Sequence, residues 1–431
     1  MKLETIYDVI GIGIGPFNLG LAALADDIPV LKCIFFDEKE SFNWHPGLLL
    51  PNARLQVPFY ADLVTLADPC SRFSYLAFLK SKRRLFRFAI HENNFATRLE
   101  YNSYCKWVVD QLNNLHFGMR CNAIHYNESQ ECYDISLLNT HTRNTFLFKS
   151  KRIVIGTGTA PLIPDCAKNN DHPCIFHSAK YLDFKKPILS KNSISIIGSG
   201  QSAAEIFSDL LPYSQAINLK WFTRAPRFYP MEYSKLSLEL TSPDYIDHFY
   251  NLPNERKPLT LKQQCVLYKG INFSLINEIY DQLYLLSLEE ASNLPGLFTN
   301  CELKNITTTD ENLSMRFLHS ETDELFESST EVIILATGYS ARIPEFIKPI
   351  KALINWNDGN YQLKRNFSID SNNKTFVQNA ELHTHGYNSA DLGLGPYRNA
   401  IILNSILEYD HFVMEREVAF QSFGGNAAEK V

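Results

Sequence analysis

Short apolar runs that end in glycine-rich turns recur along the chain. The first run, at residues 6–12, is followed by a glycine turn and by an apolar, alanine-rich stretch over 17–24. A buried run, a tight turn and a helical period predict a strand, a turn and a helix. A second apolar run, 31–37, ends in an acid. Residues 6–37 are therefore predicted to form a βαβ unit.

The same pattern returns later in the chain. Residues 193–206, SISIIGSGQSAAEI, predict a second strand, glycine turn and helix. Two more apolar runs before glycine turns, 152–158 and 331–340, predict further buried strands. The residues 399–415 indicate a C-terminal helix, and those from about 421 are expected to form a frayed tail.

Strands that alternate with helices predict an α/β fold. Two glycine turns indicate two Rossmann-like dinucleotide-binding domains, and the simplest arrangement inserts the second domain into the first. We expect the first domain at residues 1–188 and 326–431. The second domain is expected at 189–325, with segments of a small substrate-binding region.

Composition and charge narrow the class of protein. The 431 residues are 45% apolar and carry a net charge of −6, which favours a globular protein without a nucleic-acid partner. No apolar run reaches the roughly 18–20 residues that span a bilayer, and no signal peptide is expected. Nine scattered cysteines without a C-x-x-C pair favour a cytoplasmic protein with no metal site.

The first glycine turn matches the pattern G-x-G-x-x-G except at its last position, where proline stands. Such a turn lets the backbone approach a diphosphate, and the N–H groups of the following helix contact the negative charge. Proline is tolerated at the start of a helix. An acid after the second strand could bind a ribose hydroxyl. The candidate residues are Gly11, Gly13, Gly15, Pro16 and either Asp37 or Glu38.

The second glycine turn comprises Gly198, Gly200, Gln201 and Ser202. Two turns in one chain favour two dinucleotides, most simply FAD at the first and NAD(P)H at the second. Arg224 and Arg227 follow the next apolar run and could contact a 2′-phosphate, which would favour NADPH. Alternatively, they are solvated surface arginines.

On these residues the chain resembles the flavin-dependent N-hydroxylating monooxygenases of siderophore biosynthesis, which act on lysine, ornithine or diamines. The family's FAD motif also ends in proline. The resemblance extends from about residue 7 to 407. It rests on the segments GIGIGPFNLGLAAL (11–24), FFDEKESFNWHPGLLL (35–50), LQVPFYADLVTLADP (55–69), IGSGQSAAE (197–205), LATGYSARIP (335–344) and HTHGYNSADLGLGPYRNA (383–400).

The resemblance implies a fold and a reaction. An FAD domain and an NADPH domain meet a smaller substrate region. NADPH reduces FAD, O2 adds at the flavin C4a atom, and the distal oxygen of the hydroperoxide passes to a primary amine. Because an alkylammonium has a pKa near 10.4, the pocket must favour the neutral amine by desolvation. A homo-oligomer, in this family often a tetramer, is also implied.

The resemblance also assigns residues. Gln56 and Asn272 are expected beside the flavin and the substrate, as the catalytic candidates, with Gln56 also contacting the cofactor. Trp44 could instead be core, His45 a turn histidine and Asn272 a helix cap. The further residues expected to contact cofactor are Trp44, His45, Thr337, Gly338 and Tyr339.

Three positions depart from the amino-acid hydroxylases. Those enzymes carry a lysine where this chain has Ala61, and the ornithine-specific members have an asparagine at Leu238, before Glu239, and a serine at Gly393. A buried carboxylate without its cation costs several kcal/mol. We therefore expect a primary amine that lacks an α-carboxylate, namely histamine, putrescine or cadaverine, N-hydroxylated for a hydroxamate siderophore.

A diamine or imidazolium substrate would keep a second positive charge. Glu232, Glu239 and Asp391 are candidate partners, although each could be a surface carboxylate or a helix cap. Two other functions stay open: hydroxylation of lysine or ornithine despite Ala61, and flavin binding without monooxygenase activity. A disulfide reductase needs a cysteine pair, and a Baeyer–Villiger oxygenase needs a motif that residues 175–184 do not match.

Overall fold

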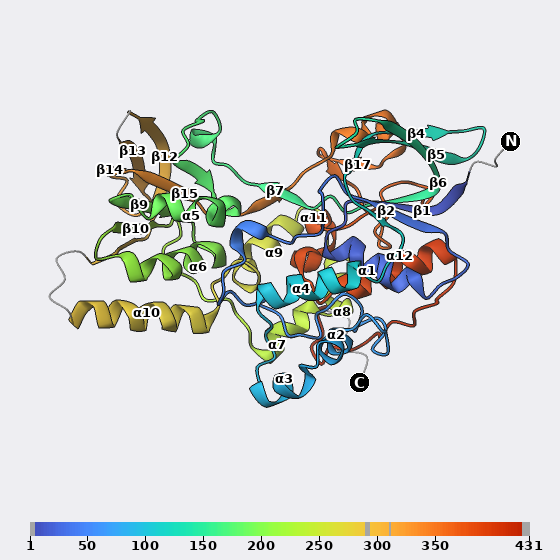
Figure 1. The fold of residues 1–431 in the computed structure, drawn as a ribbon, viewed down its shortest axis with the longest axis horizontal. Helices are drawn as coiled ribbons and strands as arrows, with labels where there is room; N and C mark the ends of the chain where they lie inside the picture. Colours follow the sequence, from blue (N-terminus) through green and yellow to red (C-terminus); the bar gives the residue numbers. More distant parts are fainter. Residues whose placement is uncertain (1–4, 289–293, 310–311, 425–431) are drawn as a thin grey trace.

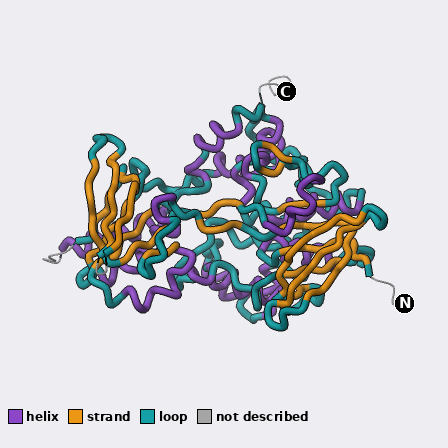
Figure 2. Tube along the Cα trace, turned by 90° about the horizontal axis from the view of Figure 1, so that it is seen from above, coloured by secondary structure: helices purple, strands orange, loops and turns teal. Residues whose placement is uncertain are grey.

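The computed structural model describes residues 5–288, 294–309 and 312–424 (Figure 1). Two lobes, each built on a sheet, lie at opposite ends of the molecule, and Figure 2 shows the helices gathered between and beside them. A two-stranded antiparallel ribbon of β7 (Thr159–Pro161) and β16 (Tyr339–Ala341) runs where the chain passes between the lobes.

The first lobe contains a seven-stranded sheet in the order β3-β2-β1-β6-β5-β4, with β19 paired to β6. Its central strands are parallel, whereas β4 and β5 are antiparallel additions. Successive residues of β1 and β2 pack into different cores on the two faces, as expected for buried parallel strands. The strands are β1 (Ile6–Ile12), β2 (Cys33–Phe36), β3 (Leu115–His116), β4 (Met119–Asn127), β5 (Cys132–Asn139), β6 (Thr145–Ile155) and β19 (Thr375–Val377).

Helices α1 (Pro16–Asp26), α2 (Tyr75–Ser81), α4 (Arg98–Val109) and α12 (Gly395–Leu407) supply buried residues to one of these cores. The helix α12 ends at residue 407 because Glu408 adopts a left-handed conformation with φ +64°. The helix expected over residues 399–415 therefore begins earlier and stops earlier than the sequence indicated. The small hairpin of β17 (Trp356–Asn357) and β18 (Asn360–Tyr361) belongs to the opposite core.

The second lobe contains a parallel five-stranded sheet in the order β11-β10-β9-β15-β8. Helices pack on one face and a three-stranded antiparallel sheet on the other. The elements are β8 (Ile175–His177), β9 (Ser193–Ile197), β10 (Asn218–Phe222), β11 (Gly296–Phe298), β15 (Val332–Leu335), α5 (Tyr181–Ile188), α6 (Gln201–Leu210) and α10 (Phe273–Leu288), with β12 (Cys301–Thr308), β13 (Leu313–His319) and β14 (Leu325–Thr330) in the antiparallel sheet.

The second sheet extends beyond the residues 189–325 that the sequence suggested for this domain. Strand β8 lies before that range and β15 lies after it, and β15 is inserted between β9 and β8. A short apolar run before a glycine turn looks the same in either lobe. The sequence pattern at 331–340 therefore predicts β15 but not the sheet to which it belongs, and β8 was not predicted.

The remaining helices are short and lie mostly between the lobes on the lower side of Figure 1. They are α3 (Leu85–His91), α7 (Lys235–Leu238), α8 (Pro243–Asn251), α9 (Lys257–Gln263) and α11 (Leu382–His385). No helix within the described ranges combines the length and the apolar composition that crossing a membrane requires.

The C-terminal residues that were expected to fray are attached to these helices. The carboxylate of Glu239 accepts the backbone N–H groups of Phe420 (3.1 Å) and Gln421 (2.9 Å), and the Phe423 ring packs on Tyr245. Residues 425–431 of the expected tail lie outside the described residues.

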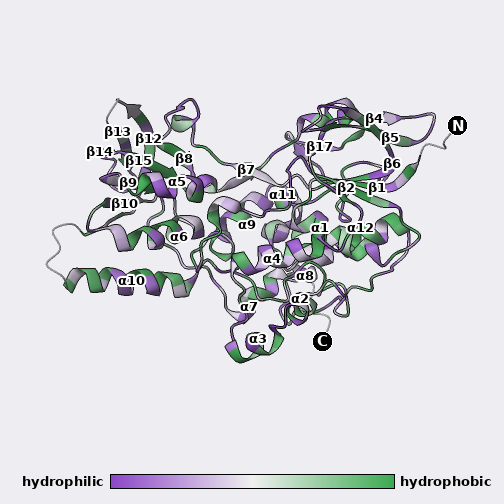
Figure 3. Ribbon diagram, viewed as in Figure 1, coloured by the Kyte–Doolittle hydropathy of each residue, from purple (hydrophilic) through white to green (hydrophobic). Residues whose placement is uncertain are grey.

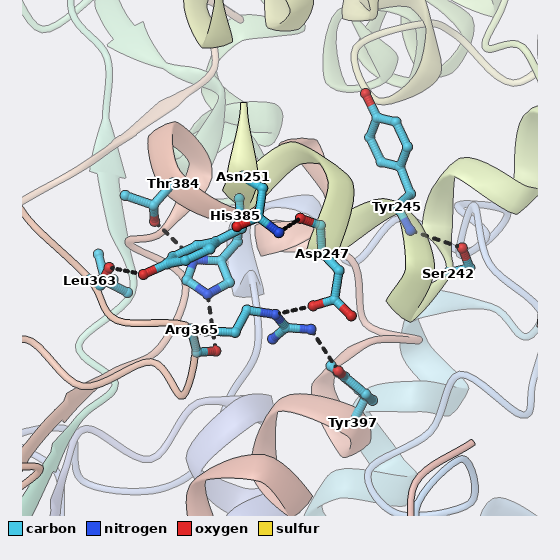
Figure 4. Close-up of polar contacts among 10 residues, drawn as sticks. Ser242, Tyr245, Asp247, Asn251, Leu363, Arg365, Thr384, His385 and Tyr397 are labelled. Carbon is cyan, nitrogen blue, oxygen red and sulfur yellow. Dashed lines mark hydrogen bonds and ion pairs between the residues drawn. The ribbon is translucent and has the colours of Figure 1, made fainter. Parts of the chain in front are cut away.

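Helix α8 is fastened to the first lobe by a polar cluster (Figure 4). Arg365 pairs with Asp247 of α8 and donates a hydrogen bond to the Tyr397 hydroxyl (2.7 Å) of α12. The imidazole of His385 lies beside this cluster, with Nε2 3.3 Å from the Arg365 carbonyl oxygen and Nδ1 2.9 Å from the Thr384 hydroxyl. Burial, together with the positive charge of Arg365, holds the pKa of His385 well below its usual value.

Acid is expected to weaken the fold through His385. In the unfolded chain this histidine takes up a proton below a pH of about 6.5, whereas the folded chain keeps it neutral. The free energy of unfolding should therefore fall as the pH drops from about 7 to about 5, by about 1.4 kcal/mol per pH unit for one such group. Denaturant titrations at each pH measure this slope.

The substitution His385→Gln should make the slope shallower than in the wild type. His91→Gln, at an exposed histidine, provides the matched control and should keep the wild-type slope. Identical slopes in all three proteins would show that His385 is not responsible.

Candidate active site

The first glycine turn offers an open approach to the start of α1. At Gly13 the backbone φ is +91°, and a Cβ atom there would lie 2.5 Å from the carbonyl oxygen of Gly156. At Gly15, which precedes Pro16 at the helix start, a Cβ atom would meet nothing within 4 Å. The free N–H groups at this helix start thus face open space, which fits a diphosphate.

The acid after the second strand supports the turn itself. Asp37 is buried, and its carboxylate accepts the N–H groups of Ile14 (2.6 Å) and Lys39 (2.8 Å). Glu38 is exposed. Gly11 lies against Phe35, where a Cβ atom would be 2.1 Å from the ring. Asp37 and Gly11 therefore hold the turn against the second strand, and binding of a ribose by Asp37 or Glu38 stays a prediction.

The starts of α1 and α12 meet across a narrow recess. Asn399 of α12 donates a hydrogen bond to the Phe17 carbonyl oxygen (3.0 Å), which fixes the two helices together. The recess is closed and leaves no room for a flavin ring, so a nucleotide can approach α1 only from the open side at Gly15. The recess is lined by Pro16, Phe17, Asp62, Leu63, Tyr101, Leu392, Gly395, Pro396 and Asn399.

A row of aromatic rings connects the first lobe to the ribbon between the lobes. The ring centre of His45 is 4.9 Å from that of Trp44 and 5.6 Å from that of Tyr339. Desolvation, with smaller contributions from Arg98 and Lys39, lowers the pKa of His45 to about 4. The Tyr339 hydroxyl is buried and has no hydrogen-bond partner among the described residues. This unpaired donor is consistent with a missing polar ligand.

The neighbouring residues Thr337 and Gly338 hold the ribbon in place. Thr337 Oγ1 donates to the Leu162 carbonyl oxygen (2.5 Å), and the Gly338 carbonyl oxygen accepts the Leu162 N–H (2.9 Å). His177 Nε2 lies 3.0 Å from that same oxygen. In this structure Thr337 and Gly338 form hydrogen bonds to the backbone of Leu162. Their contact with a cofactor stays a prediction.

The second glycine turn repeats the geometry of the first. Gly198 has φ +153°, and a Cβ atom there would lie 2.1 Å from the Ala336 carbonyl oxygen. Gly200 precedes α6 with an extended backbone, and Ser202 in the first turn of the helix is half-buried. A second helix start is therefore available to a nucleotide phosphate.

The two arginines expected to contact a 2′-phosphate follow β10 and are both exposed. The guanidinium of Arg227 lies over the Tyr229 ring, 4.5 Å from its centre. Their position after the second strand of the unit is where a 2′-phosphate would be recognised. NADPH recognition by these two side chains stays a prediction.

A chain of hydrogen bonds brings together the two catalytic candidates. Gln56 Nε2 donates to the Gly270 carbonyl oxygen (3.3 Å) and to Gln201 Oε1 (3.4 Å). The same Gln201 oxygen accepts the backbone N–H of Asn272 (2.8 Å). Asn272 Oδ1 also accepts the N–H of Ser274, so this residue caps α10 as well. Three distant segments thus meet at Gln201.

The chain continues to a buried ion pair that the sequence did not reveal. Gln201 Nε2 donates to Glu205 Oε1 (2.9 Å), and Glu205 Oε2 lies 2.8 Å from a guanidinium nitrogen of Arg98, at the start of α4. Burial raises the pKa of Glu205, and the charge of Arg98 acts in the opposite direction. Glu205 follows Gln201 by one helical turn, which was a usable signal, whereas nothing local marked Arg98.

Three of the substrate candidates lie together. A Cβ atom on Gly393 would be 3.4 Å from the Cβ of Ala61 and 3.1 Å from Asp391 Oδ1. The same carboxylate oxygen accepts the Gly393 N–H (2.6 Å). Burial raises the pKa of Asp391, whereas the N–H groups of Gly393 and Leu394 and the charge of Arg398 lower it.

The negative charge of Asp391 acts on two tyrosines. Desolvation, with the nearby Tyr60 and the charge of Asp391, raises the pKa of Tyr233 to about 12. Burial and the charge of Asp391 also raise the pKa of Tyr387. The same negative charge would attract a cation.

The other candidates for binding a cation have structural partners. Glu239 binds the backbone of residues 420 and 421, as described above. Glu232 accepts the N–H of Ser234 (2.9 Å), the residue that caps α7. Leu238 ends that helix and is partly buried. Asp391 is therefore the candidate that the structure places beside Ala61 and Gly393.

Comparison with known proteins agrees with this arrangement. Residues 5–341 match the profile of the family described as L-lysine 6-monooxygenase/L-ornithine 5-monooxygenase. A putrescine N-hydroxylase of Shewanella oneidensis is 48% identical, over 97% of this chain and 84% of that protein. A putrescine N-hydroxylase of Acinetobacter baumannii is 42% identical, over 100% of this chain and 96% of that protein.

A solved structure is also close. The FAD-bound cadaverine monooxygenase of desferrioxamine biosynthesis from Erwinia amylovora has a TM-score of 0.95 and 43% identity, over 98% of this chain and 99% of that one. The two lobes and their connecting ribbon are therefore a fold that these proteins share.

A methyl group at Gly15 is expected to weaken FAD binding selectively. The backbone at this position suits alanine, and the fold should lose about 1 kcal/mol or less. The added carbon would stand in the open space before α1, so the dissociation constant for FAD should rise about tenfold or more. Titration of the apoprotein, followed by flavin fluorescence, measures this change.

Gly424→Ala, at another glycine with open surroundings, provides the control and should bind FAD as the wild type does. If Gly15→Ala retained wild-type affinity and wild-type thermal stability, the diphosphate would have to lie elsewhere.

Proposed function

The chain belongs to the L-lysine 6-monooxygenase/L-ornithine 5-monooxygenase family of flavin-dependent N-hydroxylating enzymes, and we propose that it N-hydroxylates an aliphatic diamine for siderophore biosynthesis. Putrescine and cadaverine are the proposed substrates, because the similar proteins act on these diamines by name. The observation that carries the proposal is the cluster of Ala61, Gly393 and Asp391.

Two cofactors fit the two glycine turns. FAD would be held by the turn at Gly13 and Gly15, and NADPH by the turn at Gly198 and Gly200. When bound, FAD activates O2 with electrons from NADPH and supplies the oxygen atom for the amine. The protein then has to exclude bulk water and to place a neutral amine nitrogen at the reaction centre.

We assign the placement of that nitrogen to Gln56 and Asn272. Both are held by Gln201, which joins the first lobe to the start of α10. Rigid support of this kind lowers the entropic cost of aligning two reactants. The proposed roles follow from the convergence of both residues on Gln201.

The two amino groups of a diamine must be in different charge states. The reacting end must be neutral, and desolvation favours the loss of its proton. The far end stays an ammonium and needs an anion, which Asp391 supplies. Ala61 takes the place of the lysine that amino-acid hydroxylases use for a carboxylate. A lysine or ornithine head group would therefore be buried without a counter-ion, at a cost of several kcal/mol.

We further propose that the enzyme works in the cytoplasm, as the nine scattered cysteines suggest. Hydroxylation of lysine or ornithine is the alternative substrate assignment, and a flavin-binding protein without monooxygenase activity is the alternative of another class. A substrate panel separates all three.

The panel comprises putrescine, cadaverine, histamine, lysine and ornithine, given to FAD-loaded enzyme with NADPH and O2. We expect hydroxylamine product chiefly from putrescine or cadaverine, with kcat/KM about a hundredfold above that for lysine or ornithine, because the amino acids lack a partner for their carboxylate. Product from histamine alone would keep the lost carboxylate site but replace the diamine. A preference for lysine or ornithine would overturn the assignment, and NADPH oxidation that ignores every amine would favour the non-enzyme.

Removing the charge of Asp391 should weaken amine binding and spare NADPH. In Asp391→Asn we expect the KM for the diamine to rise about tenfold or more, because the far ammonium loses its counter-ion, with little change in the KM for NADPH. Steady-state kinetics with each substrate varied in turn separates the two constants. Glu232→Gln removes an exposed carboxylate and should leave both unchanged. An unaltered diamine KM in Asp391→Asn would remove this residue from the site.

A further inference from the structure

A buried ion pair joins the first turn of α12 to the residue before α11. The side chains of Arg398 and Glu381 keep 2% and 1% of their exposure, and a guanidinium nitrogen lies 2.7 Å from Glu381 Oε1. A cation in the first turn of a helix opposes the helix dipole. Removing both charges from water also costs free energy, and apolar residues in place of a buried pair often give equal or greater stability. Stability alone therefore does not account for this pair.

The same arginine holds the turn that carries Asp391. Arg398 Nη2 donates to the Ser389 carbonyl oxygen (2.7 Å), and the Arg398 backbone N–H donates to the Leu394 carbonyl oxygen (3.0 Å). Within the turn, the Asp391 N–H donates to the Asn388 carbonyl oxygen (3.1 Å). Since residues 389 and 394 lie on either side of Asp391, a single residue fastens both ends of this turn.

A third contact connects the guanidinium to α1. Its central carbon lies 4.4 Å from the centre of the Phe17 ring, next to Pro16 at the helix start. A Cβ atom on Gly395 would be 3.1 Å from that ring, so a glycine there lets the start of α12 approach it closely. Helices α1 and α12 lie side by side, and Figure 3 shows apolar residues along both. Arg398 is thus the charged link between the Asp391 turn and the helix start that faces the FAD diphosphate.

The charges of this cluster leave Asp391 available to a ligand. Desolvation lowers the pKa of Arg398, whereas the charges of Glu381 and Asp391 raise it, and an arginine in a protein keeps its proton. Asp391 is partly exposed, whereas Glu381 and Arg398 are buried. One guanidinium with two carboxylates has one negative charge in excess. Glu381 therefore offsets the charge of Arg398, and the charge of Asp391 remains for an ammonium.

We propose that Arg398 is a positioning residue that sets the distance between Asp391 and the start of α1, and thereby the length of diamine that the enzyme hydroxylates. The inference rests on the proposed function, in which Asp391 binds the far ammonium and FAD binds at α1. Putrescine and cadaverine differ by one methylene group, and a displacement of about 1 Å at the reacting atoms can cost about a hundredfold in rate. A fixed anchor favours one length, whereas a loosened anchor accepts both.

The test uses the full chain loaded with FAD and the substitution Arg398→Lys. Lysine keeps the positive charge beside Glu381, but its single ammonium cannot reproduce a fork that contacts Glu381 and Ser389 while lying on a ring. The wild type should prefer one of the two diamines about tenfold or more in kcat/KM, and in the variant this ratio should fall to about threefold or less. The dissociation constants of both diamines, measured by calorimetry on the oxidised enzyme, should converge in the same way.

Arg365→Lys provides the matched control. It makes the same exchange at a neighbouring arginine, which binds Asp247 and the Tyr397 hydroxyl of α12 instead of the Asp391 turn. This control should keep the wild-type ratio between the two diamines. The dissociation constant for FAD, measured by flavin fluorescence, should stay at the wild-type value in both lysine variants, which shows that the first lobe is folded.

A second variant decides the matter if Arg398→Lys does not fold. Arg398→Met together with Glu381→Gln removes both charges, so no buried charge loses its partner. Glutamine still offers an acceptor for the Ala380 N–H, which Glu381 Oε2 accepts at 2.7 Å. The preference between the diamines should fall in this double variant as well. Lower activity with both diamines at an unchanged ratio would mean that the pair serves stability alone, and would overturn the proposal.

The monoamines 1-aminobutane and 1-aminopentane separate this inference from the proposed function. Both lack the far ammonium, so the wild type should bind them more weakly than the diamines. Equal binding, or an unaltered diamine KM in Asp391→Asn, would remove the anchor and with it the proposed function. Where the anchor is established, a wild type without a preference between the diamines, or a preference that Arg398→Lys leaves intact, would overturn the role of Arg398 alone.

Discussion

The pair of Arg98 and Glu205 is the interaction on which the two lobes depend. Arg98 begins α4 of the first lobe and Glu205 lies in α6 of the second, and the side chains keep only 13% and 4% of their exposure. Charges removed from water this far are tolerated when each has the other as partner. A rotation between the lobes would separate them, so the pair selects one relative position. Gln201 is hydrogen-bonded to Glu205, to Gln56 and to the backbone of Asn272, so it fixes both catalytic candidates relative to the ion pair.

A strand, a glycine turn and a helix start recur in both lobes, and packing explains most of the glycines in these turns. A Cβ atom at Gly11 would collide with the Phe35 ring. At Gly13 it would collide with the Gly156 carbonyl group, and at Gly198 with the Ala336 carbonyl group. Gly15 differs because nothing in the protein approaches it. The glycines with close neighbours keep the strand, turn and helix together, whereas Gly15 leaves room for a ligand. The glycine motif thus combines two separate constraints.

Much of the fold could be predicted from local sequence, since a strand, a glycine turn and a helix start are specified within about ten residues. The strands at 6–12 and 193–197, the α/β fold and the membership of an N-hydroxylating flavoprotein family were all available in this way. Contacts between distant segments could not be predicted from local sequence. The Arg98–Glu205 pair joins residues with no shared pattern, and the insertion of β15 beside β8 depends on the second sheet as a whole. Glu239 looked free in the sequence because its partners lie 181 and 182 residues further along the chain.

The order of strands has a consequence for synthesis on the ribosome. Every strand of the second sheet lies between residues 175 and 335, so that sheet is complete once this contiguous stretch has emerged. The first sheet begins earlier, at residue 6, but lacks β19 until residue 377 and the covering helix α12 until residue 407. The lobe that is translated first is therefore finished last, and its unpaired strand edge waits for most of translation. While residues 336–407 are being added, one sheet of a nascent chain is complete and the other is still waiting for β19 or for α12.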